Sequence, residues 1–228
     1  MRIVYCFTVF IFFFYNQAAM GKTMTQLTLK QQNMIPIAAF TADGDLQRLS
    51  LAIHKGLDAG LTINEIKEIQ IQLYAYAGFP RAINAVSTLM TIIKERQSQN
   101  IHDEVGKDAS PISNTTDMLA LGTKVQTQLA GKVVEGPLFD FAPTLNQYLR
   151  AHLFGDIFAR DILSYQDREI ATIAALSVIK GADSQLKAHY QIGLNAGLTQ
   201  SQLLEIVQLI AATVDQNTGN HAKVILEQ

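Results

Sequence analysis

Hydrophobic residues recur at helical rather than strand spacing through most of the chain. Two segments place leucine, isoleucine or valine at intervals of three and four residues: Ile63, Ile66, Ile69 and Leu73, and then Leu203, Ile206, Val207 and Ile210. This spacing puts the apolar side chains on one face of a helix. No alternating apolar and polar run of strand length, bounded by turns, appears in the sequence. The pattern therefore predicts an all-α fold in which these helices bury one face.

Both segments belong to an internal repeat. Residues 56–69 and 193–206 are identical at 8 of 14 positions, at a constant offset of 137. Each copy has a glycine where a helix needs a left-handed residue after its end, then a threonine N-cap with its capping-box partner three residues on. These residues are Gly60, Thr62 and Glu65, and Gly197, Thr199 and Gln202. The repeat predicts a duplicated helical hairpin within one fold.

The remaining helices follow from the same reasoning. We predict helices over 46–58, 80–96, 115–130, 140–152 and 167–180. Pro80 and Pro143 fall in first turns, where proline is tolerated. Gly181 ends the last helix, and Asp183 is predicted to be the N-cap of the next. The polar stretch 97–114 is predicted to connect the two halves.

The first residues have the order of a signal peptide. Arg2 precedes an apolar run over 3–15, which is followed by small residues around Ala18-Ala19 and Gly21. The run is shorter than the roughly 20 residues of a membrane-spanning helix, so a stable membrane anchor is not expected. The prediction is a periplasmic or secreted protein. The alternative is a cytoplasmic protein whose translation starts at Met24.

Composition excludes several classes of function. The formal net charge is −2, and no cluster of lysine and arginine is present to neutralise phosphates, so nucleic acid is not an expected partner. The single cysteine, Cys6, lies in the predicted signal peptide, which leaves the mature chain without disulfide or thiol chemistry. The five histidines include no pair at the three- or four-residue spacing typical of a helical metal site, so no metal is expected.

Longer motifs in the second half resemble the carboxymuconolactone decarboxylase family. They are the segments 152–161, 167–176, 185–189 and 193–199, and a degenerate copy lies at Gly60-Leu-Thr and 74–84. The resemblance implies an alkylhydroperoxidase D-like helical fold. It divides the chain into a first half over 22–98, a connecting segment with one helix over 99–138, and a second half over 139–228, after the signal peptide at 1–21.

One branch of that superfamily reduces peroxides through a C-x-x-C-x-x-x-H motif. Counted back from His189, the two cysteine positions hold Ala182 and Gln185. Neither side chain forms a thiolate or a disulfide. Alkylhydroperoxidase or peroxiredoxin-type antioxidant activity is therefore disfavoured.

The decarboxylase branch uses no metal or organic cofactor, so the resemblance implies none. His189 is the candidate acid, because an imidazole exchanges protons near neutral pH. Glu169 is the candidate partner that orients it. Arg160 and Arg168 are the candidate ligands of a substrate carboxylate. Subtracting 137 from Glu169 and His189 gives Gln32 and Ala52, so any site belongs to the second half.

Each of these residues also has a purely structural interpretation. A histidine in a helix is often a packing residue, and a glutamate early in a helix favours the helix dipole. Arg168 can be a solvated neighbour, and Arg160 can belong to a surface ion-pair cluster with Asp156 and Asp161. Tyr74 and Tyr76 are interpreted as core or subunit-interface residues.

Two functions remain open at this point. The first is cofactor-free lyase or isomerase chemistry on a small carboxylated or lactone-like molecule, with His189 as acid or base and Glu169 as its partner. The second is a non-catalytic helical oligomer that binds a small molecule or a protein. By resemblance, a homo-oligomer with three or six subunits is expected.

Overall fold

The computed structural model describes residues 26–228, which form helices and connecting loops with no strand. The all-α prediction is confirmed. The predicted signal peptide at 1–21, Cys6 and the alternative start at Met24 lie outside the described residues. Within 26–228, no helix is both long and apolar enough to cross a membrane.

Four helices in each half repeat in the same order. The first set is α1 (Leu29–Asp43), α2 (Leu46–Asp58), α3 (Ile63–Ala77) and α4 (Phe79–Ser98), and the second is α8 (Tyr165–Val178), α9 (Asp183–Asn195), α10 (Gln200–Thr213) and α11 (Gln216–Leu226). Three of the four pairs begin 137 residues apart: 46 and 183, 63 and 200, and 79 and 216. The duplication therefore extends beyond the predicted hairpin to a four-helix unit.

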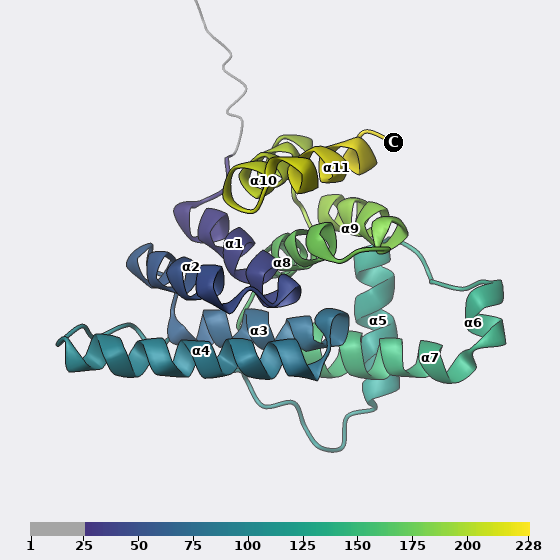
Figure 1. The fold of residues 1–228 in the computed structure, drawn as a ribbon. Coiled ribbons are helices and arrows are strands. Elements are labelled where there is room, and N and C mark those ends of the chain that lie inside the picture. Colours follow the sequence, from purple (N-terminus) through teal and green to yellow (C-terminus); the bar gives the residue numbers. More distant parts are fainter. Residues whose placement is uncertain (1–25) are drawn as a thin grey trace, which may run out of the picture.

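Helices α1 and α8 lie at the centre, with α2, α3 and α4 on one side and α10 and α11 on the other (Figure 1). A single apolar cluster draws residues from all eight of these helices. Helix α1 was not predicted, because its buried residues, which include every position from Ile37 to Ala42, surround the helix and leave little periodicity. Pro36 lies inside the same helix, a residue that is unfavourable in a helix interior.

The capping signals in the repeat are confirmed. Gly60 and Gly197 both have positive φ, at 88° and 102°. Thr62 and Thr199 accept from the backbone N–H three residues on, and each capping box is complete. These interactions satisfy donors that a helix start otherwise leaves without partners.

Other predicted boundaries differ from the structure. The helix expected over 140–152 is broken at Ala142, because Pro143 cannot donate a helical hydrogen bond and instead begins a new helix. The segment forms α6 (Pro137–Phe141), α7 (Pro143–Tyr148) and a π-helix, η1 (Leu149–Phe158). Asp183 was predicted to be an N-cap; Ala182 occupies that position, and the Asp183 carboxylate pairs with His221.

The polar connection after α4 is fixed to the start of α3. The backbone N–H groups of Ile63 and Asn64 donate to the carbonyls of Glu104 and Val105, each at 2.9 Å. Arg96 pairs with Asp103, and both side chains are more than nine-tenths buried. The chain then enters α5 (Met118–Ala130), which lies against η1.

Helix α5 and η1 form a second, smaller apolar cluster around Val125, Leu129 and Phe158. Their backbones approach closely at two glycines. A Cβ on Gly122 would overlap the carbonyl oxygen of Arg150, and one on Gly155 would lie 2.7 Å from the carbonyl oxygen of Met118. Only glycine fits at this crossing.

We predict that Gly122→Ala lowers the free energy of unfolding by roughly 1–3 kcal/mol, because the added methyl group meets rigid backbone. Gly193→Ala is the matched control, since its nearest neighbours are side-chain atoms at 3.1–3.5 Å. That variant should stay within about 1 kcal/mol of the parent, aided by the higher helix propensity of alanine. Chemical denaturation measures both, and equal stability of the two variants would contradict the close backbone approach.

Candidate active site

The candidate acid and its partner are in contact. His189 Nδ1 lies 2.7 Å from Glu169 Oε2. Glu169 is fully buried and His189 is 9% exposed. Glu169 is the fifth residue of α8, in its second turn, because the helix begins two residues earlier than expected from the sequence. Its distance from the helix start weakens the explanation by the helix dipole, whose effect is confined to the first turn.

The contact defines the orientation of the imidazole. A carboxylate accepts hydrogen bonds, so Nδ1–H donates to Glu169 and the other ring nitrogen is directed elsewhere. His189 Nε2 has no hydrogen bond to any of residues 26–228. It is therefore the nitrogen available to give or take a proton.

Tyr76 from α3 completes the cluster. Its ring meets the His189 ring edge to face, with centroids 5.8 Å apart and planes at 74°. Burial raises the pKa of Tyr76, and the charge of Glu169 raises it further, so the phenol stays neutral. The nearby Thr172 hydroxyl and the positive charge of Arg168 oppose part of this increase in the pKa.

Two buried atoms of this cluster have no hydrogen-bond partner among the described residues, Tyr76 Oη and Glu169 Oε1. Buried polar atoms are usually paired, and exceptions concentrate where a protein binds or reacts. A phenol O–H and a carboxylate oxygen thus remain without partners in the described residues beside the imidazole.

Arg168 does not face this cluster. The side chain is fully buried; it donates to Glu68 Oε1 at 2.7 Å and to Gln72 Oε1 at 2.9 Å. Gln72 in turn donates to the Thr172 hydroxyl at 2.8 Å. Burial lowers the pKa of Arg168, and the hydrogen bond with Glu68 opposes that effect. The arginine joins α8 to α3 across the centre of the molecule.

Arg160 meets the same carboxylate from the other side. Its Nε and Nη2 lie 3.0–3.1 Å from the two oxygens of Glu68, and its side chain is 33% exposed. This pairing replaces the surface cluster with Asp156 and Asp161, whose carboxylates bind His152 and Ser110 instead.

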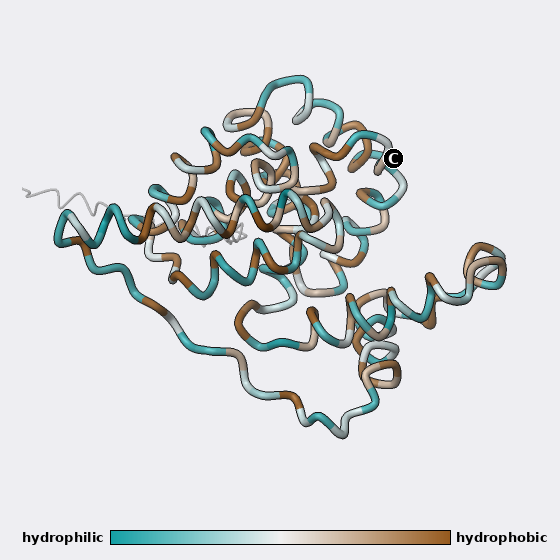
Figure 2. The backbone as a smooth tube through the Cα atoms, turned by 60° about the horizontal axis from the view of Figure 1, so that its bottom comes forward, coloured by the Kyte–Doolittle hydropathy of each residue, from teal (hydrophilic) through white to brown (hydrophobic). Residues whose placement is uncertain are grey.

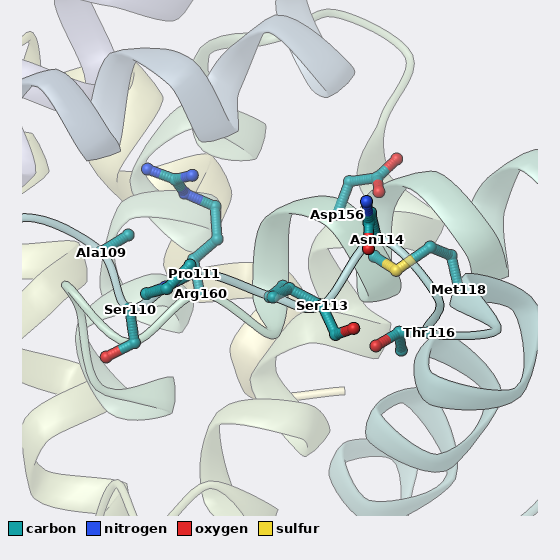
Figure 3. Close-up of a pocket in the computed structure, with 10 residues that line it drawn as sticks. Ala109, Ser110, Pro111, Ser113, Asn114, Thr116, Met118, Asp156 and Arg160 are labelled. Carbon is teal, nitrogen blue, oxygen red and sulfur yellow. The ribbon is translucent and has the colours of Figure 1, made fainter.

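Arg160 also lines a pocket of about 370 Å³ with Asp156 and the connecting segment around 109–118 (Figure 3). Its contact Glu68 precedes Tyr76 by eight residues on α3, a helical distance of about 12 Å. The four predicted site residues therefore do not converge. His189 and Glu169 form one cluster, and Arg160 and Arg168 meet at Glu68.

Glu68, Gln72 and Thr172 were not singled out from the sequence, and Tyr76 was assigned to core or interface. A signal for Glu68 was present, since Glu68 and Glu205 are among the identical positions of the repeat. Glu205 accepts from Gln32 Nε2 at 3.0 Å, so both glutamates bind a residue of the central helix in the other half. Tyr76 lies outside the matched segment.

No group of three or more His, Cys, Asp or Glu side chains within 26–228 is arranged to hold a metal ion. At the positions of the peroxidase cysteines, Ala182 is buried at the start of α9 and Gln185 is exposed in its first turn.

Comparison with known families accounts for the duplication. The model of the carboxymuconolactone decarboxylase family matches the chain twice, over residues 12–89 and 143–228. The chain belongs to the carboxymuconolactone decarboxylase family. Among curated proteins, no significant match was found. The two family matches contain the two four-helix sets except for the end of α4, and α5 lies outside both.

In this carboxymuconolactone decarboxylase family member, we expect Glu68 and Arg168 to be energetically coupled. Glu68→Gln leaves the buried Arg168 without a counter-charge and should lower the free energy of unfolding by about 3–5 kcal/mol. Adding Arg168→Met to Glu68→Gln removes the uncompensated charge, so the double variant should be more stable than Glu68→Gln alone. Denaturant titration of the parent, the two single variants and the double variant tests the coupling. If the double variant loses the sum of the unfolding free energies lost by the single variants, the two residues are not coupled.

Proposed function

We propose that this protein catalyses cofactor-free acid/base chemistry of the lyase or isomerase type on a small carboxylated or lactone-like molecule. The observation that carries the proposal is the buried 2.7 Å contact between His189 and Glu169, which leaves Nε2 free of any hydrogen bond within 26–228. Family membership supports the same chemistry without defining the substrate.

A decarboxylation places specific demands on such a site. The bond between carbon and carboxylate breaks, CO₂ leaves, and the electron pair stays on the carbon skeleton until a proton reaches it. In the proposal, His189 supplies that proton from Nε2. Glu169 holds the ring and stabilises its protonated form, and the neutral Tyr76 phenol donates a hydrogen bond to a substrate oxygen.

His189→Ala should reduce turnover of 4-carboxymuconolactone by roughly a hundredfold to ten-thousandfold, the usual contribution of a positioned acid. His221→Ala is the matched control, because His221 also pairs with an acidic side chain of the second half, that of Asp183, but is exposed. It should retain parental activity. Lactone loss followed by ultraviolet absorbance measures both variants.

Two results would oppose the proposal. Lactone turnover that survives His189→Ala would remove the acid from its role, and an inactive parent protein would exclude this substrate and favour a non-catalytic binding protein. A hydroperoxide assay on the same preparation should show no turnover. Peroxide reduction would reveal a route that does not use the cysteine positions.

We also propose that the protein forms a homo-oligomer. Helices α6 and α7 project from the bundle as an arm, defined here as residues 137–148 (Figure 1), and several residues of this arm are hydrophobic (Figure 2). Phe141 is 89% exposed, and Leu138, Leu145 and Tyr148 are exposed as well. Exposed apolar groups gathered on one projection are typical of a subunit contact.

Phe141→Glu should therefore lower the molar mass found by light scattering coupled to gel filtration, because a charge replaces the apolar anchor. Leu29→Glu is the control, since Leu29 is an exposed leucine at the start of α1. A monomeric parent protein, or the same mass for all three proteins, would exclude the arm as the contact.

A further inference from the structure

A pocket between the first-half helices α1 and α2 and the second-half helix α10 lies at the position equivalent to the candidate active site. It has a volume of about 460 Å³. The offset of 137 relates His189 to Ala52 and Tyr76 to Thr213. Helices α1 and α8 begin 136 residues apart, so the structural counterpart of Glu169 is Asn33 rather than Gln32. All three counterparts line this pocket.

Two differences between the halves explain why this position is open. Alanine and threonine in place of histidine and tyrosine remove most of the side-chain volume that fills the second-half site. At the candidate active site, Tyr76 and Ile192 also pack against the apolar cluster of α5 and η1. Within residues 26–228 those two helices have no second copy. The counterpart of Ile192 is Lys55, which lines the open pocket.

The wall of the pocket combines cations with apolar surface. The Lys55 ammonium group makes no ion pair or hydrogen bond with any residue in 26–228. Arg48 stacks over the Phe40 ring at 4.5 Å. Its Nε binds Asp45 at 2.7 Å and one Nη binds the carbonyl of Val214, while Nη2 has only a 3.8 Å contact with Asp43.

The apolar part of the wall comes from all three helices, through Pro36 and Phe40, Leu51 and Ala52, and Leu209 and Ala212. The volume lies within the range of roughly 300–1,000 Å³ that is common for small-molecule sites. An apolar floor with a free ammonium group at its edge fits a molecule that has a hydrocarbon body and one negative charge.

We propose that this pocket is a second ligand site, which binds a small carboxylate with an aromatic or alicyclic body and does not turn it over. Lys55 meets the carboxylate, and Phe40 and Ala52 contact the body. Asn33, Ala52 and Thr213 offer no acid or base at the positions of Glu169, His189 and Tyr76. Binding of the carboxylate in this pocket does not depend on the proposed catalysis at His189.

The absence of tryptophan from the sequence allows a direct test on the full chain. Leu51 is 62% exposed at the pocket, so Leu51→Trp places a single indole there. Titration with benzoate should shift the indole emission with saturation below about 10 mM. Benzyl alcohol, which lacks the charge, should bind roughly fivefold more weakly, as expected for loss of a solvent-accessible ion pair.

Lys55→Met in the Leu51→Trp protein should weaken benzoate binding by roughly the same fivefold factor and leave benzyl alcohol unchanged. The control is Lys124→Met, a lysine on α5 that is exposed and outside the pocket. His189→Ala should leave the benzoate titration unchanged, which separates this site from the catalytic proposal.

Three outcomes would overturn the inference. A non-saturating emission change would show that benzoate does not occupy the pocket. Equal affinities for benzoate and benzyl alcohol would show that the pocket does not recognise the carboxylate, and so would equal benzoate affinities of the Lys55→Met and Lys124→Met proteins.

Discussion

Glu68 is a buried carboxylate held between two guanidinium groups, with Arg168 at 2.7 Å and Arg160 at 3.0 Å. Removing the charges of Glu68 and Arg168 from water is costly, and the attraction compensates only when the partners keep a close, fixed geometry. The contact therefore constrains α3 of the first half against α8 of the second. Tyr76 and Glu169 belong to these same two helices. The ion pair that joins the halves therefore also sets the position of the Tyr76 phenol relative to the His189–Glu169 pair, called here the dyad.

The duplicated four-helix units share one backbone arrangement but differ in the side chains at equivalent positions. Glu205 repeats the role of Glu68 but binds the neutral amide of Gln32 rather than a charged arginine. The inserted helices α5 and η1 pack beside Tyr76 and Ile192, and the equivalent surface of the first half has Lys55 and an open pocket. Equivalent helices thus support a buried contact between His189 and Glu169 at one position and an accessible cavity with Lys55 at the other.

Local signals in the sequence were sufficient for the capped hairpins, since Thr62 with Glu65 and Thr199 with Gln202 satisfy backbone donors within four residues. They were insufficient for α1, which is buried on most sides, and for the break at Ala142. The contact of His189 with Glu169 followed from a motif. The arginines did not follow, because adjacent residues on a helix point about 100° apart, so Arg168 faces Glu68 while Glu169 faces His189.

The geometry of the dyad also limits which reactions the site supports. Only one nitrogen of His189 lacks a hydrogen bond, and the groups beside it are a neutral phenol and a carboxylate oxygen. An imidazole, a phenol and a carboxylate can exchange or hold protons, but none of them is a thiolate that stores electrons. Ala182 and Gln185 occupy the positions where such thiols would stand. The decarboxylation proposed above requires a proton delivered to carbon, so it asks only proton transfer of these groups, whereas peroxide reduction by thiols requires electrons that they do not supply.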